Sequence, residues 1–242
     1  MPKLLNIDQN AKTVKGQAKG YLTGILYLAP AKLSGFEVCP GRSAGCTASC
    51  LNTAGRGAFT STQKARIRKT KEYFVDKQAF VTKLNKEIYA LKKKAMKMGL
   101  EPCVRLNGTS DLSWEENVVP QNPDVQHYDY TKRYDRMLEY LAGKLPKNYH
   151  VTFSLSESNL PKALEVLGRG GNVAVVFDTK KGQALPLVWN GFPVVDGDLS
   201  DLRFLDPKGV VVGLRAKGRA KKAKLGFVQQ AQVTPHPQQM VA

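Results

Sequence analysis

The stretch Asn172-Val-Ala-Val-Val-Phe-Asp178 places five consecutive apolar residues between two polar ones, and three of the five are valine. A short, continuous run of this composition is typical of a strand buried on both faces, as in a parallel sheet. We therefore predict a strand here. Weaker runs of the same kind predict further strands, at residues 21–28, 103–107, 126–130, 150–155, 192–195 and 210–214.

Helical patterns lie between these runs, at residues 61–98, 133–144 and 161–168. The first is long enough for one helix or for two joined helices. Its apolar residues keep spacings of three, four and seven, which predicts one buried face. Ser61 or Thr62 is expected to cap its start, and Gly99 is expected to end it. The apolar positions are Phe74, Val81, Leu84, Ile88, Leu91, Ala95 and Met98.

Strands that alternate with helices imply mostly parallel pairing with crossover helices. We predict an α/β fold, a partial or irregular (βα) TIM-like barrel with a cysteine-bearing loop after the first strand. An open doubly wound sheet is the alternative. The expected organisation is a flexible basic lead-in at 1–19, one domain at 20–227 with that loop at 33–59, and a loose tail at 228–242.

The loop contains Cys39-Pro-Gly-Arg-Ser-Ala-Gly-Cys46-Thr-Ala-Ser-Cys50, which has three thiols within twelve residues. Small residues around them let the backbone pack close to a bulky group and donate N–H groups to cluster sulfides. We predict an iron–sulfur cluster on Cys39, Cys46 and Cys50. Three thiolates leave one iron of a [4Fe–4S] cube without cysteine, and its loss gives a [3Fe–4S] form. Zinc is the alternative, with Cys103, His127, His150 or His236 as a fourth ligand.

Charge is the second strong feature, because 37 Lys and Arg against 20 Asp and Glu give a formal net charge of +17. Such a surplus favours binding to DNA or RNA. The basic residues gather in two blocks, at 61–98 and 203–226. The predicted nucleic-acid contacts are Lys64, Arg66, Arg68, Lys69, Arg215, Lys217, Arg219, Lys221 and Lys222. No apolar run approaches the roughly 20 residues that a membrane span needs, so we expect a soluble, intracellular protein.

Polar residues follow most of the predicted strands. In a barrel, such residues meet at the carboxyl ends of the strands and form the binding mouth. We therefore predict a cofactor-binding site beside the cysteine loop. Its candidate residues are Asn107, Ser110, Asp111, Tyr130, Lys132, Ser154, Ser156, Asp178 and Arg215.

Two resemblances follow from these motifs. A three-cysteine loop after a first strand, followed by a βα barrel, resembles the radical S-adenosylmethionine superfamily. More closely, Cys39 to Asn52, Arg105-Leu-Asn-Gly-Thr-Ser-Asp111, Tyr130-Thr-Lys132 and residues 173–198 resemble the bacteriophage "gene product 88" family. The resemblance implies a phage protein in the host cytoplasm and an iron–sulfur barrel, without a settled activity.

The chain departs from the radical superfamily in its cysteine spacing, which is C-x₆-C-x₃-C where that superfamily has C-x₃-C-x₂-C. Asp111 stands near the place of the motif that holds the methionyl amine of S-adenosylmethionine. Two hypotheses remain. The first is an iron–sulfur protein that binds nucleic acid, and the second is a radical-type enzyme that binds S-adenosylmethionine at the open iron. A zinc-stabilised accessory protein is a third, weaker hypothesis.

Overall fold

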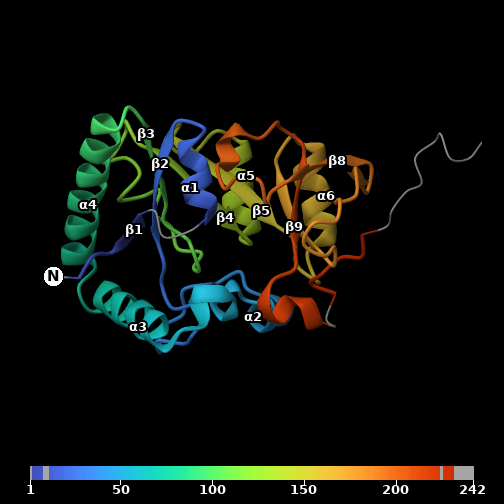
Figure 1. The fold of residues 1–242 in the computed structure, drawn as a ribbon, viewed down its shortest axis with the longest axis horizontal. Coiled ribbons are helices and arrows are strands. Elements are labelled where there is room, and N and C mark those ends of the chain that lie inside the picture. Colours follow the sequence, from blue (N-terminus) through green and yellow to red (C-terminus); the bar gives the residue numbers. More distant parts are fainter. Residues whose placement is uncertain (1, 8–10, 224–225, 232–242) are drawn as a thin grey trace, which may run out of the picture.

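One nine-stranded sheet forms the centre of the computed structural model, which describes residues 2–7, 11–223 and 226–231 (Figure 1). The order of the strands is β1-β2-β3-β4-β5-β6-β9-β8-β7. The strands are β1 (Leu5–Ile7), β2 (Tyr21–Leu26), β3 (Glu101–Arg105), β4 (Gln126–Thr131), β5 (Tyr149–Ser154), β6 (Val173–Phe177), β7 (Val188–Trp189), β8 (Phe192–Asp196) and β9 (Val211–Arg215).

The seven strands from β2 to β8 in this order pair in parallel, and β1 and β7 pair antiparallel at the two ends. The predicted mixed α/β fold with parallel pairing is thus confirmed. The ends of the order do not meet, so the sheet of the described residues is not closed. Parallel pairing brings the carboxyl ends of all seven strands to one edge, where the predicted polar residues follow them.

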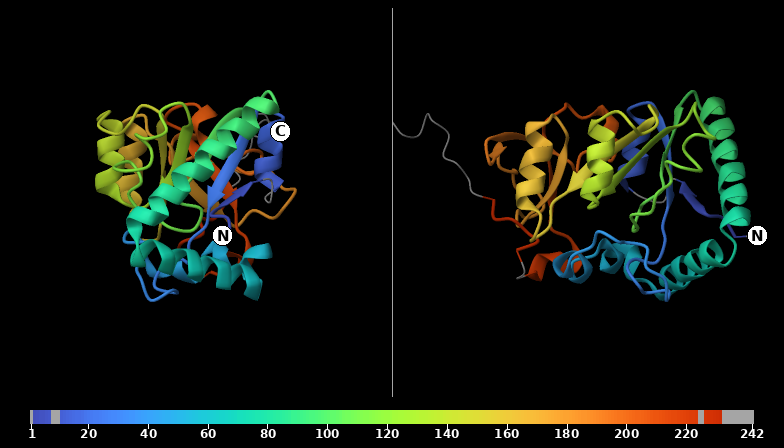
Figure 2. Two further views of the ribbon diagram at one scale, coloured as in Figure 1. Left: turned by 90° about the vertical axis from the view of Figure 1, so that its left-hand side faces the viewer. Right: turned by 180° about the vertical axis from the view of Figure 1, so that it is seen from behind.

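The helices lie on both faces of the sheet and along its carboxyl edge (Figures 1 and 2). α5 and α6 cover one face, α1 lies on the opposite face, and α4 packs on β2 and β3. The helices are α1 (Ala11–Gln17), α2 (Ala44–Ala48), α3 (Thr60–Val75), α4 (Lys77–Lys97), α5 (Tyr134–Leu141) and α6 (Leu160–Gly168). The 3₁₀ turns are η1 (Leu51–Thr53), η2 (Gly55–Ala58), η3 (Arg203–Leu205) and η4 (Gly218–Lys222).

The helical region at 61–98 is two helices, which separate at Asp76. The Asp76 carboxylate caps α4 by accepting a hydrogen bond from Ala79 N at 2.9 Å. Neither Ser61 nor Thr62 caps α3, because that helix begins one residue earlier, after Phe59. The buried face of α4 is as predicted from Val81 to Ala95. Phe74, which lies near the end of α3, and Met98, which follows α4, are instead exposed.

The first nineteen residues contain β1 and α1, where the sequence predicts a flexible lead-in. Leu4 and Leu5 are buried, and their backbone N–H groups donate to the Glu87 carboxylate at 2.9 Å. The ammonium of Lys69 donates to the Leu4 carbonyl. These partners lie on α3 and α4, so only the folded chain reveals them.

The predicted loose tail falls mainly on residues 232–242, which lie outside the described residues. Just before them, Gln229 pairs with Phe177 and donates its N–H to the Val176 carbonyl at 2.8 Å. Among the described helices, none is long and apolar enough to cross a membrane.

A separate layer lies below the carboxyl edge of the sheet in Figure 1. It consists of α2, η1, η2, α3 and η4, and we call it the lower layer. η4 contacts η1 although about 165 residues separate them, and an added Cβ at Gly218 would stand 2.9 Å from the Ala54 Cβ. The lower layer therefore includes a part of each basic block, α3 from the first and η4 from the second.

Candidate functional site

A cavity of about 240 Å³ lies between the carboxyl ends of the strands and the lower layer. Cys39, Cys46 and Cys50 all line it, from the connection between β2 and α3. Seven of the nine predicted cofactor-binding residues line it as well. These are Asn107, Ser110, Asp111, Tyr130, Lys132, Ser154 and Arg215.

The other two predicted residues, Ser156 and Asp178, do not line the cavity. Ser156 is buried, and its backbone N–H donates to Asn159 Oδ1 at 2.7 Å in the turn before α6. The Asp178 carboxylate accepts a hydrogen bond from Ala231 N at 2.9 Å, because the segment at 226–231 runs beside β6. Ser156 thus takes part in a local turn through its backbone, and Asp178 holds a distant segment against the end of β6.

The three loop cysteines are free thiols in partly buried positions. The pKa of Cys39 is raised to about 12, mainly by burial and also by the neighbouring thiols of Cys50 and Cys46, while a hydrogen bond from the Ala31 N–H opposes the rise. Burial also raises the pKa of Cys50. The thiols of Cys39 and Cys50 are therefore protonated at neutral pH without a metal, so metal binding must release their protons.

Within the ranges 2–7, 11–223 and 226–231, no group of three or more His, Cys, Asp or Glu side chains could hold a single metal ion. A four-ligand zinc site is therefore not preformed there. A cube-shaped cluster sets a different requirement, because each cysteine binds a different iron and the sulfurs stand further apart.

Among the described residues, none of the candidate fourth ligands lines the cavity. Cys103 is fully buried against Tyr128 and Leu202, with its Sγ 3.2 Å from Thr23 Oγ1. His127 is also fully buried, and burial lowers its pKa to about 4. His150 contacts Tyr140, and His236 lies outside the described residues.

A carboxylate from the far half of the chain holds the cysteine loop in place. Glu157, between β5 and α6, accepts hydrogen bonds from Gly45 N at 2.7 Å and from Ser43 Oγ at 2.8 Å. Gly45 has no room for a side chain, since a Cβ there would stand 2.6 Å from Glu157 Oε2. Glu157 therefore fixes the start of α2, which contains Cys46.

Replacing Glu157 with alanine is expected to loosen this loop and to lower the free energy of unfolding by about 1–2 kcal/mol. Hydrogen exchange at the Gly45 amide should accelerate, because its acceptor is lost. Burial raises the pKa of Glu157, but the hydrogen bonds from Gly45 and Ser43 outweigh it and hold this pKa below its ordinary value. The stabilisation from Glu157 is thus present at pH values above its pKa in the unfolded chain, and it is lost as pH falls through its pKa in the folded protein.

Urea unfolding at several pH values measures this effect, and the difference between the two proteins should shrink in acid. Glu165→Ala is the matched control, because Glu165 lies on the surface of α6, where it interacts with Arg169 and with the Tyr134 hydroxyl and not with the cysteine loop. Unchanged exchange at Gly45 in Glu157→Ala would contradict the role given to Glu157.

Asp111 lines the cavity, but its carboxylate already has three donors. Thr131 Oγ1 donates at 2.8 Å, Lys132 N at 2.9 Å and Arg136 Nη1 at 3.1 Å. A ligand amine would have to displace these donors to bind Asp111. The carboxylate joins the ends of β3 and β4 to α5.

Arg136 is the residue at the centre of this arrangement, and the sequence analysis misses it. Its side chain is fully buried, and it pairs with Glu115 at 2.6 Å as well as with Asp111. It also donates to the Tyr149 hydroxyl, which donates in turn to Asp129. Arg136 lies one place before Met137, on the apolar face of α5, and a cation at such a position is the signal of buried carboxylate partners.

Other cations of the cavity are also paired. Arg215 donates to Asp196 at 2.9 Å and to Asp198 at 3.3 Å, and Arg105 pairs with Asp201 at 3.1 Å. Lys132 instead donates from Nζ to Ser154 Oγ at 2.6 Å. These polar side chains of the cavity are thus ordered by their own contacts.

Two of the predicted nucleic-acid contacts, Arg66 and Lys69, are buried within the protein. The Arg66 guanidinium donates to Asn52 Oδ1 and lies over the Tyr27 ring at 4.8 Å. Lys69 donates to Leu4 and Asn6. Both side chains lie on the side of α3 that contacts β1 and η1, so they hold the lower layer together.

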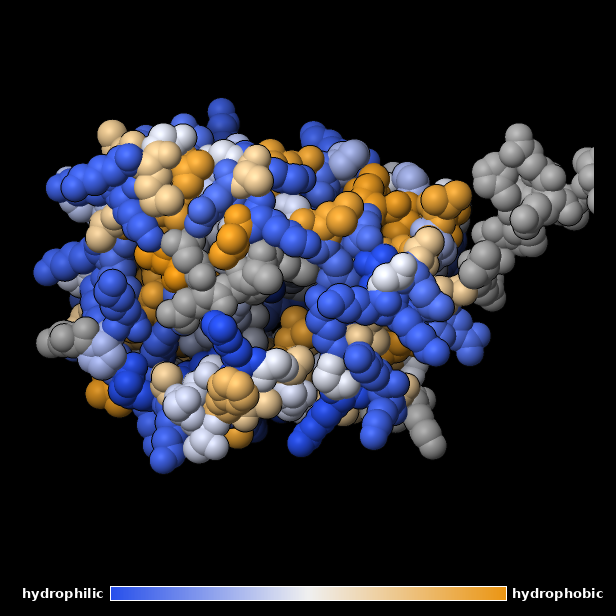
Figure 3. Space-filling model, viewed as in Figure 1, coloured by the Kyte–Doolittle hydropathy of each residue, from blue (hydrophilic) through white to orange (hydrophobic). Residues whose placement is uncertain are grey.

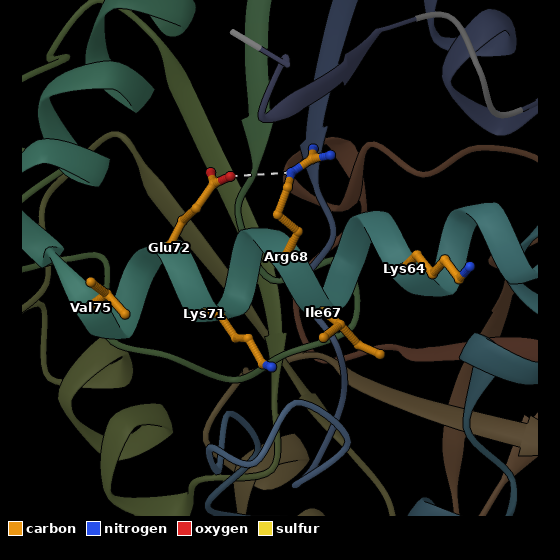
Figure 4. Close-up of a pocket in the computed structure, with 6 residues that line it drawn as sticks. All are labelled: Lys64, Ile67, Arg68, Lys71, Glu72 and Val75. Carbon is orange, nitrogen blue, oxygen red and sulfur yellow. Dashed lines mark hydrogen bonds and ion pairs between the residues drawn. The ribbon is translucent and has the colours of Figure 1, made fainter.

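The remaining basic candidates reach the surface, apart from the partly buried Arg215. Figure 3 shows hydrophilic side chains projecting from the lower layer. On α3, Arg68 forms an ion pair with Glu72 at 3.2 Å, and Lys64, Ile67, Lys71 and Val75 line an open hollow on its outer face (Figure 4). The exposed candidates are Lys64, Arg68, Lys217, Arg219, Lys221 and Lys222.

Comparisons with known proteins give one match. No curated protein and no solved structure matches this chain, so the radical S-adenosylmethionine resemblance has no matching protein or structure to support it. The family model described as "Gene product 88" matches residues 3–231, which is most of the chain. The protein described here therefore belongs to the gene product 88 family.

Proposed function

We propose that this phage-family chain is an iron–sulfur protein of the host cytoplasm, with its cluster held by Cys39, Cys46 and Cys50. In this proposal, the open nine-stranded sheet corresponds to the partial barrel that the sequence predicts. The observation that carries the proposal is that three free thiols from one short loop line a single cavity at the carboxyl edge of a parallel sheet. Such a cluster supplies one-electron chemistry and an iron without a protein ligand.

The residues around the thiols suit a bulky inorganic group. An added Cβ at Gly41 would stand 3.0 Å from the Lys132 carbonyl carbon, so the loop backbone lies close against the strand ends. Ser49 also lines the cavity, and its buried hydroxyl has no hydrogen-bond partner within the described chain. A cluster sulfide or cysteine sulfur would accept that hydrogen bond, and outer hydrogen bonds of this kind tune a cluster.

Anaerobic purification followed by iron, sulfide and zinc analysis tests the proposal. We expect iron and acid-labile sulfide together, broad visible absorption and a paramagnetic signal after reduction or after loss of one iron. Zinc without sulfide would replace this proposal with the zinc-stabilised protein.

We further propose that the lower layer binds nucleic acid. Exposed lysines and arginines from α3 and η4 lie in one layer of a protein with a net charge of +17. Cations that neutralise phosphates release bound counterions, which makes the affinity depend steeply on salt.

Binding to DNA and RNA should weaken as salt rises, and the double variant Lys221→Ala with Lys222→Ala should lower the slope of log affinity against log salt by about 2. Fluorescence anisotropy across a salt series measures both quantities. The matched control removes Lys93 and Lys97, two exposed lysines near the end of α4 that is furthest from the lower layer. Absence of binding at low salt, or an equal loss of slope in the control, would contradict this proposal.

The cavity supports a radical-type enzyme as a second candidate. Its volume of about 240 Å³ lies beside the thiols and has seven polar strand-end residues in its walls. Incubation of the reduced, reconstituted protein with S-adenosylmethionine tests this candidate, and formation of 5′-deoxyadenosine is the expected product. Its absence in a protein with a full cluster would remove the enzyme hypothesis and leave the cluster proposal intact.

A further inference from the structure

Large aromatic side chains are exposed on the lower layer, at both ends of α3. Phe59, directly before the helix, is 60% exposed. At the other end Phe74 is 39% exposed, and Phe36 stacks on it with ring centroids 4.4 Å apart and planes 4° from parallel. Exposed rings next to cations offer flat surfaces to other π-systems.

Lysines lie between these rings on the outer face of α3. Lys64 and Lys71 are exposed, and neither forms an ion pair within the described residues. Figure 4 shows Ile67 and Val75 on the same side of the helix as Lys71. At about 1.5 Å per residue, Phe59 and Phe74 lie roughly 20 Å apart along this face.

The basic surface continues beyond the Phe59 end of the helix. η4 packs against η1, and Gly218 approaches Ala54, which precedes Phe59 by five residues. The exposed Arg219 and Lys221 belong to this turn. Exposed cations of η4 therefore lie near the segment that precedes Phe59, and those of α3 follow Phe59 and precede Phe74 along the helix.

We propose that the lower layer binds single-stranded nucleic acid along α3, with phosphates at Lys64 and Lys71 and bases stacked on Phe59 and Phe74. This inference rests on the proposed nucleic-acid binding and specifies its form. A single strand presents free base faces, which stack on aromatic rings without regard to sequence. A duplex hides those faces and would leave the exposed rings without a role.

The test measures anisotropy of a labelled pyrimidine oligonucleotide with the full chain. Phe59→Ala should weaken binding about tenfold and leave the salt slope unchanged, because stacking releases few ions. Lys64→Ala should instead lower the slope by about 1. Tyr89→Ala is the matched control, since Tyr89 is 56% exposed on α4, away from the lower layer, and should bind like the wild type.

Phe59→Leu keeps an apolar side chain of similar size and should also bind weakly, which separates stacking from a change in folding. If both Phe59 variants bind with wild-type affinity, the inference is overturned, whereas the proposed salt-dependent binding to nucleic acid is not affected by that result. If unlabelled duplex, or polyglutamate as an acidic polypeptide, displaces the labelled oligonucleotide as well as an unlabelled single strand does, the inference is overturned too. If the wild type binds no nucleic acid at low salt, this inference and the proposed nucleic-acid binding fail together.

Discussion

Replacing Arg136 with methionine is expected to lower the free energy of unfolding by about 3–5 kcal/mol, because it leaves buried carboxylates without their cation. Asp111 and Glu115 each lose an ion pair, and the Tyr149 hydroxyl loses a donor. Methionine keeps much of the volume, so the effect is mainly electrostatic. Urea unfolding followed by the fluorescence of the buried Trp114 measures it.

The loss should depend on pH. Burial raises the pKa of Asp129 to about 7 even with Arg136 nearby, and removal of that cation raises it further. A carboxyl whose folded pKa exceeds its unfolded one favours folding less as pH rises between the two values. The cost of ionising Asp129 develops equally in both proteins up to its wild-type pKa of about 7, and above that pH it continues to rise only in Arg136→Met. The stability deficit of Arg136→Met should therefore grow as pH rises above about 7.

Arg169→Met is the matched control, because Arg169 belongs to an exposed pair with Glu165 on α6. Exposed pairs of this kind contribute at most about 0.5 kcal/mol. An equally small loss in Arg136→Met, or a deficit that shrinks as pH rises above about 7, would contradict the role of Arg136 as the cation of a buried network.

Replacing Cys39, Cys46 or Cys50 singly with serine should remove most of the iron and sulfide from the protein. A serine hydroxyl is a far weaker ligand for iron than a thiolate, and three ligands leave no spare one. Cys103→Ser is the matched control, since Cys103 lies outside the cavity in a cluster with Tyr128 and Leu202. Metal and sulfide analysis of the four variants, purified without oxygen, measures the effect.

The outcome that would contradict the ligand assignment is loss of the cluster in Cys103→Ser together with its retention in the three loop variants. Full retention in only one loop variant would reduce the ligand set to two cysteines. The first result would make Cys103 a ligand, and the second would require another residue of the cavity as a ligand.

The strands and most cavity residues can be predicted from sequence because their signals are local. An apolar run such as 173–177 predicts a strand, and a parallel sheet brings the residues that follow its strands to one edge. Seven of nine candidates line the cavity for that reason. Ser156 and Asp178 do not, because Ser156 belongs to the turn before α6 and the Asp178 carboxylate binds the backbone of Ala231.

The remaining features depend on contacts between distant segments. Lys69 and Arg66 have the composition of a basic surface helix, and only the packing of α3 against β1 and η1 reveals that they are internal. The burial of Arg136 depends on its ion pairs with Asp111 and Glu115, which both lie in the loop after β3. The aromatic rings at Phe59 and Phe74 become neighbours of lysines only once the helix forms.

The contact between Glu157 and Gly45 joins residues 112 positions apart in the chain. Such a contact forms late in folding, because the intervening strands from β3 to β5 must be in place before the loop-closure entropy is offset. The cysteine loop is therefore among the last parts to reach its final position. Any system that delivers iron and sulfide would meet a sheet already assembled, with three thiols still on a mobile segment, and insertion of the cluster would complete the folding of that segment.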